Sequence, residues 1–409
     1  MVEARHLTPV YLLKFMLKWL LIAGSVGILS GSASALFLTS LDWVTETRYQ
    51  HPWLLWLLPA GGAFISYLYL KVGKDAGRGN NLIIEQIHSG EGAVPLRMAP
   101  LVLLGTLTTH LFGGSAGREG TAVQMGGSLS EGLGKLLKLN RLDRKIILMC
   151  GISSGFGAVF GTPLAGTLFG LEVLAIGVIS YEALLPCFIA SYVGHLVTTA
   201  WGINHIHFTI GDIPPLGWLV VIKVVCASVL FGLSAILFTQ LTRYLKQLFS
   251  KWFTNPVLKS AFGGLLVIAL VYALGTRDYL GLGIPLMQQA FQEAVSPLVF
   301  LLKTLFTALT LGTGFQGGEV TPLFVIGSTL GSALAGLFQI SVPFLAAIGF
   351  ISVFSGAAKT PLACFIMGIE LFGSEGAIYL FIGCMIAFLC SGHIGIYEAQ
   401  KPIAYRIEN

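Results

Sequence analysis

Charged side chains are scarce in this sequence. Asp, Glu, Lys and Arg make up 11% of the 409 residues, whereas hydrophobic residues make up 55%. A soluble domain carries about 25% charged residues, so the composition excludes an ordinary soluble globular protein. The basic residues gather in short loops, such as residues 135–145. Such clusters are typical of membrane topology and argue against nucleic acid as a partner. We predict a multi-pass membrane protein.

Cysteine pairs and the usual cofactor motifs are also missing. The six cysteines lie in apolar stretches, without a Cys-x-x-Cys pair or the Cys/His spacing of a metal site. No His-Glu-x-x-His motif, phosphate-binding P-loop or dinucleotide fingerprint occurs. We therefore expect no metal, no cofactor and no disulfide framework. The cysteines are Cys150, Cys187, Cys226, Cys364, Cys384 and Cys390.

Glycine, in contrast, is abundant. The 51 glycines interrupt many of the apolar segments. Segments such as 98–114, 121–137 and 360–373 are shorter than the ~20 residues that a perpendicular helix needs to cross a bilayer. Glycine also permits close helix packing and irregular backbone that lines a cavity. The sequence therefore predicts an all-α membrane protein with tilted, re-entrant and broken helices.

Two glutamates lie among glycines inside apolar regions. Residues 117–121 read Gly-Arg-Glu-Gly-Thr, and residues 317–321 read Gly-Gly-Glu-Val-Thr. A charged side chain inside a membrane is energetically costly and usually functional. A carboxylate that occurs twice among glycines indicates a transport site built from duplicated halves.

A second pair of segments supports the duplication. Residues 162–172 and 360–370 both begin Thr-Pro-Leu-Ala and end in glutamate, and they lie 198 residues apart. We predict two membrane repeats, about residues 1–210 and 211–409. We expect the repeats to be inverted relative to each other, as is common in transporters with broken helices.

Three glycine-flanked segments predict helix starts. They are residues 77–81, 113–120 and 312–322, each close to the start of an apolar run. The first N–H groups of a helix lack intrahelical partners and carry partial positive charge. Glycine lets that backbone approach a ligand closely. Helix starts that meet at membrane depth would make an anion site that needs no full cationic charge.

The two glutamates each allow a functional and a structural interpretation. Glu119 is either a titratable gate or the ion-pair partner of Arg118 at a membrane boundary. As a gate, its ionised carboxylate would occupy the anion site, and its protonated form would leave. Glu319 is either part of the ion path or a cap on the N–H groups of the helix that follows it. We favour the path for Glu319, and the residues alone leave both interpretations of Glu119 open.

Four other charged residues in apolar stretches have simpler interpretations. For Glu172 and Glu370, which end the two Thr-Pro-Leu-Ala segments, we expect packing at helix ends. For Lys303 and Lys359 we expect the ammonium group to reach the membrane interface, with a carboxylate partner as the alternative.

The motifs resemble those of the CLC family of chloride channels and proton-coupled anion antiporters. Residues 117–120 match the Gly-Arg-Glu-Gly-Pro element of that family, with Thr121 in place of proline. Residues 161–166 resemble a later helix start, residues 318–322 occupy the Gly-x-Phe-x-Pro position, and Tyr397 resembles the inner-gate tyrosine. The resemblance runs over nearly the whole chain. It implies a CLC-type fold of two inverted repeats and a homodimer with one anion pathway per subunit.

The departures from the chloride-type pattern concern the anion contacts. Chloride-type members have a serine in a Gly-Ser-Gly-Ile-Pro element, whereas this segment reads Gly-Arg-Gly-Asn-Asn-Leu. Asn80 is the best match for the serine, with Arg78 and Asn81 as alternatives. Val320 replaces the phenylalanine of the second element, and the acidic Glu319 precedes it.

Two further departures concern the proton and the end of the chain. Chloride/proton exchangers often carry two glutamates where this sequence has Glu172 followed by Val173, so their internal proton-relay carboxylate is missing. We expect no cytoplasmic regulatory domain after residue 409. The combination is similar to the bacterial fluoride/proton antiporter branch of the family.

These departures favour fluoride as the transported anion. It is small and strongly hydrated, so its site must offer strong hydrogen-bond donors, and an asparagine amide donates such bonds. A second carboxylate suits a path that also moves protons, because protonation removes its charge and makes it a donor. We therefore predict a multi-pass protein of a bacterial cell membrane that exports fluoride ions in exchange for protons. Membrane lipid and a second copy of the chain are its other expected partners.

The predicted site follows from these matches. Glu119 and Glu319 are expected to act in gating and proton transfer. The expected anion contacts are Asn80, Gly117, Arg118, Gly120, Val320, Thr321 and Tyr397.

Two alternatives stay open. One is a chloride-selective exchanger or channel of the same family. The other is an intramembrane enzyme, in which Ser115, Ser153 or Ser154 would be the nucleophile and His110, close in sequence to Ser115, the base. No residue pattern that would orient such a base is evident.

Overall fold

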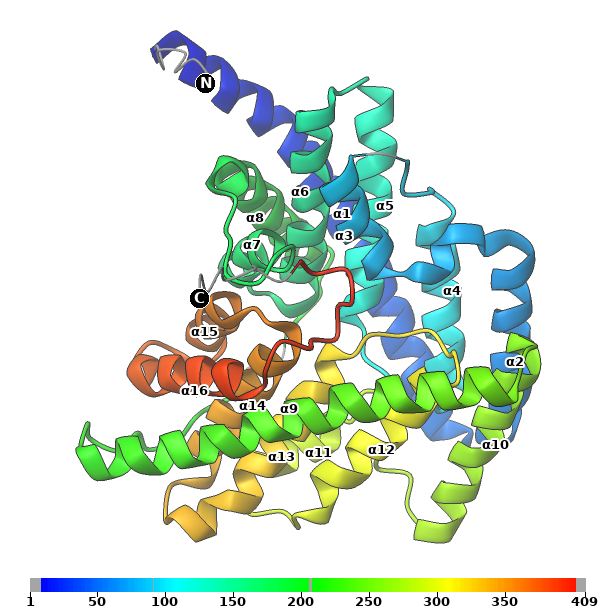
Figure 1. The fold of residues 1–409 in the computed structure, drawn as a ribbon, viewed down its shortest axis with the longest axis vertical. Helices are drawn as coiled ribbons and strands as arrows, with labels where there is room; N and C mark the ends of the chain where they lie inside the picture. The colour runs from blue at the N-terminus through cyan, green and yellow to red at the C-terminus, as the bar shows by residue number, and fades with distance from the viewer. Residues whose placement is uncertain (1–8, 91, 206–207, 402–409) are drawn as a thin grey trace, which may run out of the picture.

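The computed structural model describes residues 9–90, 92–205 and 208–401, and most of these residues are helical. Within these ranges there is no β-strand, only two isolated bridges between single residues. This confirms the predicted all-α fold. Figure 1 shows helices that cross at widely differing angles rather than an upright bundle.

The α-helices differ widely in length. In the first half of the chain they are α1 (Pro9–Gln50), α2 (Leu58–Leu68), α3 (Asn80–Ser89), α4 (Met98–Leu111), α5 (Glu119–Leu136), α6 (Arg141–Phe160), α7 (Pro163–Glu172) and α8 (Leu184–Ala200). In the second half they are α9 (Trp218–Trp252), α10 (Pro256–Leu274), α11 (Ile284–Ala290), α12 (Leu298–Gly312), α13 (Val320–Phe338), α14 (Val342–Ala358), α15 (Pro361–Phe372) and α16 (Ala377–Cys390). Four short helical turns lie between them: η1 (Pro52–Leu57), η2 (Tyr69–Gly73), η3 (Lys74–Arg78) and η4 (Tyr181–Ala183).

Long and short apolar helices occur together. In the described part of the chain, six helical segments are long and apolar enough to cross a membrane. Helices α7 and α15 have only 10 and 12 residues. At about 1.5 Å per residue they fall short of the ~30 Å hydrocarbon core of a bilayer. The predicted mixture of spanning and half-spanning helices is therefore present. The six long segments are Leu12–Gln50, Pro52–Arg78, Tyr181–Ala200, Trp218–Trp252, Pro256–Leu274 and Val320–Phe338.

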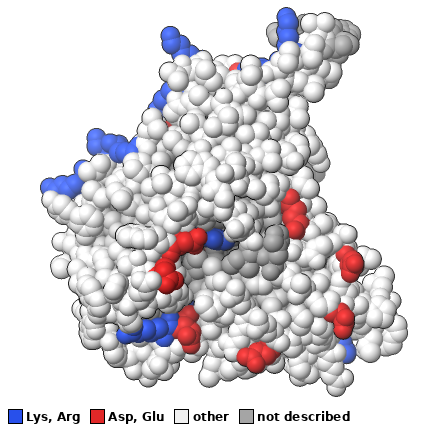
Figure 2. All heavy atoms as spheres, turned by 180° about the vertical axis from the view of Figure 1, so that it is seen from behind, with Lys and Arg blue, Asp and Glu red and all other residues white. Residues whose placement is uncertain are grey.

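Two helices form the centre of the molecule. Every residue of α6 from Ile146 to Phe160 is buried, as is every residue of α14 from Phe344 to Ala358. Helix α6 packs against α5 and α8, and α14 packs against α13 and α16. The long helices α1 and α9 instead expose leucine and tryptophan side chains, as a lipid-facing surface does. Figure 2 shows broad uncharged areas on one face of the molecule.

Glu172 and Glu370 connect the two halves of the chain reciprocally. The carboxylate of Glu172 accepts hydrogen bonds of 3.1 and 2.8 Å from two N–H groups in the first turn of α15. The carboxylate of Glu370 accepts two hydrogen bonds, both of 2.8 Å, from the first turn of α7. A two-fold axis between equivalent units produces reciprocal contacts of this kind. The predicted helix-end role of both glutamates is confirmed, and the boundary near residue 210 stays a prediction.

Lys303 and Lys359 are both fully buried, so the prediction that they reach the membrane interface is wrong. The Nζ atom of Lys303 donates to the Ser115 hydroxyl at 2.9 Å and to two backbone carbonyls. The Nζ atom of Lys359 donates to the carbonyl and the hydroxyl of Ser391, at 3.0 and 2.6 Å. Neither lysine has a carboxylate partner among the described residues. Oxygen acceptors from distant segments replace the water that each ammonium would otherwise need.

Candidate functional site

The loops that precede α5 and α13 meet through a pair of backbone hydrogen bonds. The N–H of Gly117 donates to the carbonyl of Gly318 at 2.6 Å, and the N–H of Gly318 donates to the carbonyl of Gly117 at 2.8 Å. A Cβ atom on Gly318 would collide with the carboxylate of Glu119, so this approach requires glycine. Two of the three predicted helix starts therefore meet directly.

Glu119 lies at this meeting point, and its side chain is buried. Its Oε1 atom accepts a 2.5 Å hydrogen bond from the backbone N–H of Val320. Its Oε2 atom accepts from the hydroxyl of Thr321 at 2.7 Å and from the backbone N–H of Arg118 at 3.0 Å. Val320 is the first residue of α13, so its N–H has no partner within the helix. The carboxylate thus takes the place that a free anion would take at this helix start.

The guanidinium of Arg118 forms no salt bridge with Glu119 among the described residues. It lies over the ring of Phe160, with 5.9 Å between the guanidinium carbon and the ring centre. The interpretation of Glu119 as the ion-pair partner of Arg118 is therefore wrong. Arg118 reaches the site through its backbone N–H.

The loop before Glu119 is fixed by hydroxyl groups of α12. The backbone N–H of Ser115 donates to the hydroxyl of Thr310 at 3.1 Å. The hydroxyl of Ser115 lies 2.9 Å from that of Thr307 and receives the 2.9 Å hydrogen bond from Lys303. Because these partners hold the loop, they also fix where Glu119 begins α5.

Glu319 borders a cavity of about 190 Å³. Its carboxylate forms no cap on α13, so the capping alternative is wrong, and no hydrogen bond or ion pair engages it within the described ranges. The side chain borders open space beside the start of α13 instead. The charged, amide and tyrosine side chains that share this cavity are Asn80, Asn81, Gln124, Arg243, Lys246, Tyr397 and Glu398.

The structure separates the three candidates for the anion-contacting residue in the segment before α3. Arg78 pairs with Glu85 at the surface. The amide oxygen of Asn81 accepts a 3.1 Å hydrogen bond from the N–H of Ala399. Asn80 borders the cavity, and its Nδ2 atom lies near Gly120. Of the three, Asn80 has its amide donor beside the start of α5, and its role in anion binding stays a prediction.

Tyr397 is buried and borders the same cavity. Its ring packs against Phe169, with 6.1 Å between ring centres. Tyr397 and Asn80 also border a second, much smaller cavity. The structure thus brings Asn80, Glu319 and Tyr397 to one cavity next to the helix starts that hold Glu119.

Sequence reasoning missed Gln124, Arg243 and Lys246. Gln124 lies one turn after Gly120 on α5, and this spacing, with an amide in an apolar stretch, is a signal that could have identified it. Arg243 and Lys246 belong to the last third of α9. Their place at the cavity depends on tertiary packing, for which the sequence carries no local signal.

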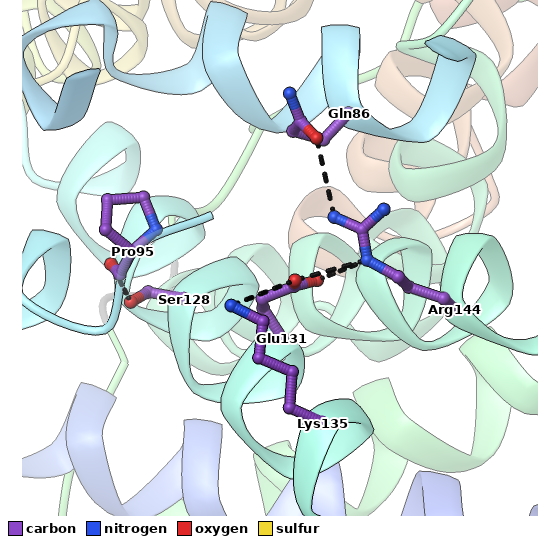
Figure 3. Close-up of polar contacts among 6 residues, drawn as sticks. All are labelled: Gln86, Pro95, Ser128, Glu131, Lys135 and Arg144. Atoms are coloured by element: carbon purple, nitrogen blue, oxygen red, sulfur yellow. Dashed lines mark hydrogen bonds and ion pairs between the residues drawn. The ribbon is translucent and has the colours of Figure 1, made fainter. Parts of the chain in front are cut away.

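An ion cluster around the buried carboxylate of Glu131 holds α3 against α5 and α6 (Figure 3). The guanidinium of Arg144 donates to the buried carboxylate of Glu131 at 2.8 Å and to the amide oxygen of Gln86 at 3.4 Å. Lys135 approaches the same carboxylate at 3.6 Å. Gln86 belongs to α3 and Glu131 to α5. The cluster therefore helps to fix the helix that begins at Asn80 relative to the helix that begins at Glu119.

The residues proposed for an intramembrane enzyme do not form a catalytic pair. The two ring nitrogens of His110 lie 2.9 and 3.1 Å from backbone carbonyl oxygens, those of Thr106 and Ala116. The hydroxyl of Ser115 is engaged by α12, and Ser153 and Ser154 are fully buried. No cluster of three or more His, Cys, Asp or Glu that could hold a metal occurs in the described ranges.

The family model described as voltage gated chloride channel matches residues 61–392. The chain belongs to the CLC family. Among CLC proteins, it is 52% identical over 396 residues to the chloride/fluoride channel protein of Pseudomonas syringae pv. tomato, covering 95% of this chain and 88% of the relative. It is 24% identical to the H(+)/Cl(-) exchange transporter ClcA of Vibrio vulnificus, covering 94% of this chain and 88% of that relative.

Solved CLC structures share the fold. The crystal structure of a CLC-type fluoride/proton antiporter matches with a TM-score of 0.92 and 34% identity, covering 97% of this chain and 99% of that chain. A slow cyanobacterial Cl-/H+ antiporter matches with a TM-score of 0.81 and 19% identity, covering 93% and 96% of the two chains. The predicted CLC-type fold and family are confirmed. This CLC chain is a multi-pass membrane transport protein.

Proposed function

We propose that this protein exchanges fluoride for protons across a bacterial cell membrane and thereby exports cytoplasmic fluoride. The observation that carries the proposal is the position of Glu119. Its carboxylate holds the Val320 N–H and the Thr321 hydroxyl, which are the donors that an entering anion needs. Anion and carboxylate therefore compete for one place.

This competition couples fluoride to protons. When the carboxylate of Glu119 takes up a proton, it loses its negative charge and leaves the donors at the start of α13. Fluoride then binds to the Val320 N–H and the Thr321 hydroxyl, next to Asn80. When the proton leaves, the carboxylate returns and displaces fluoride. Each passage of fluoride thus requires Glu119 to gain and lose a proton.

The groups around the start of α13 favour fluoride over chloride as the substrate. Asn80 offers an amide donor, and Glu319 becomes a neutral hydrogen-bond donor when it is protonated. The relatives support this choice, since one solved structure at 34% identity is a fluoride/proton antiporter and one relative at 52% identity is named a chloride/fluoride channel protein. The latter name also keeps a channel, and transport of chloride, as the second candidate. The homodimer, with one pathway in each subunit, is part of the proposal.

A transport assay on the purified protein in liposomes tests the proposal. Liposomes loaded with potassium fluoride are diluted into fluoride-free buffer with a potassium ionophore, so that K+ leaves and balances the charge. A fluoride electrode and a pH electrode record both transported ions. We expect fluoride to leave while protons enter in a fixed ratio. Fluoride efflux without proton uptake would establish a channel instead. Equal rates with chloride-loaded liposomes would overturn the choice of fluoride.

A further inference from the structure

The amide of Gln124 is a buried polar group that has no role in the exchange proposed above. Gln124 lies on α5, one turn after Gly120, and borders the same cavity as Asn80 and Glu319. Only 7% of the surface of this residue is exposed. Its Oε1 atom is buried and has no hydrogen-bond partner among the described residues.

The surrounding backbone makes room for this amide. Gly79, just before α3, has a φ of +58°, and a Cβ atom at that position would lie 3.3 Å from Nε2 of Gln124. A side chain at position 79 would therefore crowd the amide. The loop before α3 and the first turns of α5 together hold Gln124 beside Asn80.

A buried carbonyl oxygen without a donor is energetically costly, by about 1–3 kcal/mol. The site therefore requires a ligand or a side chain that brings a hydrogen. The anion itself brings none. Arg243, Lys246 and Tyr397 also border the cavity and always carry a donor. Glu319 and Glu398 gain a donor only by taking up a proton, because a carboxylic acid donates one O–H, and Glu398 already approaches Arg243 at 3.7 Å. The amide N–H groups of Gln124 can at the same time donate to an anion beside Asn80.

We propose that Gln124 is a further contact residue of the ion path, whose carbonyl accepts a hydrogen bond from protonated Glu319 while its N–H groups donate to fluoride. The hydrogen bond leaves the proton on the carboxyl oxygen of Glu319, so the amide changes no protonation state. The inference rests on the proposed fluoride/proton exchange. It assigns two roles to the neutral side chain of Gln124: its N–H groups donate to fluoride, and its carbonyl accepts from the proton that Glu319 carries.

Two substitutions separate this role from simple packing. Gln124→Met keeps the approximate length and volume but removes the donor and the acceptor, so we expect exchange to fall about tenfold or more at every pH. Gln124→Glu has an acceptor-only carboxylate when ionised but both a donor and an acceptor when protonated. Its rate relative to the wild type should therefore recover as the pH falls, whereas that of Gln124→Met should stay low.

Matched controls complete the experiment. Gln288→Met changes an exposed glutamine on α11 that does not border the cavity, and it should exchange like the wild type. Wild-type rates for Gln124→Met, or a Gln124→Glu ratio that does not rise toward low pH, would overturn the inference. Absence of coupled exchange in the wild type would instead overturn the proposed function.

A structure of the wild type tests the contact without any variant. A cryo-electron microscopy map of the protein in lipid nanodiscs at low pH, with fluoride present, should place Oε1 of Gln124 within about 3.2 Å of a carboxyl oxygen of Glu319. Oε1 turned toward any other donor would overturn the inference. This measurement decides the question even when a substitution prevents folding.

Discussion

The Oε1 atom of Glu119 lies 2.5 Å from the backbone nitrogen of Val320, so a side chain from the first half of the chain completes a helix start in the second half. Glu119→Gln tests this relationship. The amide cannot ionise, so it cannot alternate between a bound anion and a protonated group. We expect fluoride-driven proton uptake into liposomes to fall to the level of protein-free liposomes, as recorded by a pH electrode.

An exposed glutamate serves as the control for this change. Glu375→Gln alters the connection before α16, where the side chain is exposed, and it should leave proton uptake unchanged. Proton uptake by Glu119→Gln at the wild-type rate would contradict the gating role of Glu119.

Glu319 and Glu398 border the same cavity but differ in setting. Glu319 lies beside the start of α13 without a hydrogen-bond partner in the described part of the chain, whereas half-exposed Glu398 approaches Arg243 at 3.7 Å. We expect Glu319→Gln to slow the exchange about a hundredfold, as loss of a positioned proton-transfer group does. Glu398→Gln should change it about twofold or less, because exposed pairs contribute little. Initial rates of fluoride efflux and proton uptake are measured for both variants. Equal loss of rate in Glu319→Gln and Glu398→Gln would contradict a special role for Glu319.

The selectivity prediction compares two neighbouring asparagines. Asn80→Ser exchanges the amide donor beside Gly120 for a hydroxyl, so the ratio of fluoride to chloride transport should fall about fivefold, the equivalent of one hydrogen bond. Asn81→Ser removes the acceptor of the 3.1 Å bond from Ala399, so it should lower stability and leave the ratio unchanged. Efflux from liposomes loaded with each halide gives the ratio. A larger shift for Asn81→Ser would assign the anion contact to that residue.

Motifs predicted much of the fold and of the site. The Gly-Arg-Glu-Gly segment and its counterpart near residue 319 identified two helix starts, and the structure joins them through Gly117 and Gly318. This succeeded because the local requirements, glycine for close approach and an unpaired N–H for an anion, are visible in the sequence itself.

The positions of Lys303 and Lys246 could not be predicted, because they depend on contacts between distant segments of the chain. Lys303 is far from water in the structure, because Ser115 and two carbonyls from other segments satisfy its ammonium group. Lys246 borders the cavity because α9 packs against α12 and α13. Neither arrangement follows from hydropathy or spacing, since each is set by which helices meet.

The reciprocal contacts of Glu172 and Glu370 lead to the last prediction. Each carboxylate accepts two N–H groups at the start of the opposite helix. In Glu172→Gln or Glu370→Gln, the amide keeps one acceptor oxygen and loses the charge. We therefore expect each substitution to lower the free energy of unfolding by about 1–3 kcal/mol. The midpoint of thermal unfolding in detergent measures this loss, with the exposed Glu182→Gln as the unchanged control.

Transport by these two variants separates a structural role from a role in proton transfer. Glu172 precedes Val173, the position where chloride/proton exchangers often have a second glutamate, and its carboxylate is already engaged by α15. The folded fraction of Glu172→Gln should therefore keep the wild-type ratio of protons to fluoride, as should that of Glu370→Gln. A changed ratio of protons to fluoride in Glu172→Gln alone would assign Glu172 to the proton path. It would also show that Glu172 and Glu370 are not functionally equivalent.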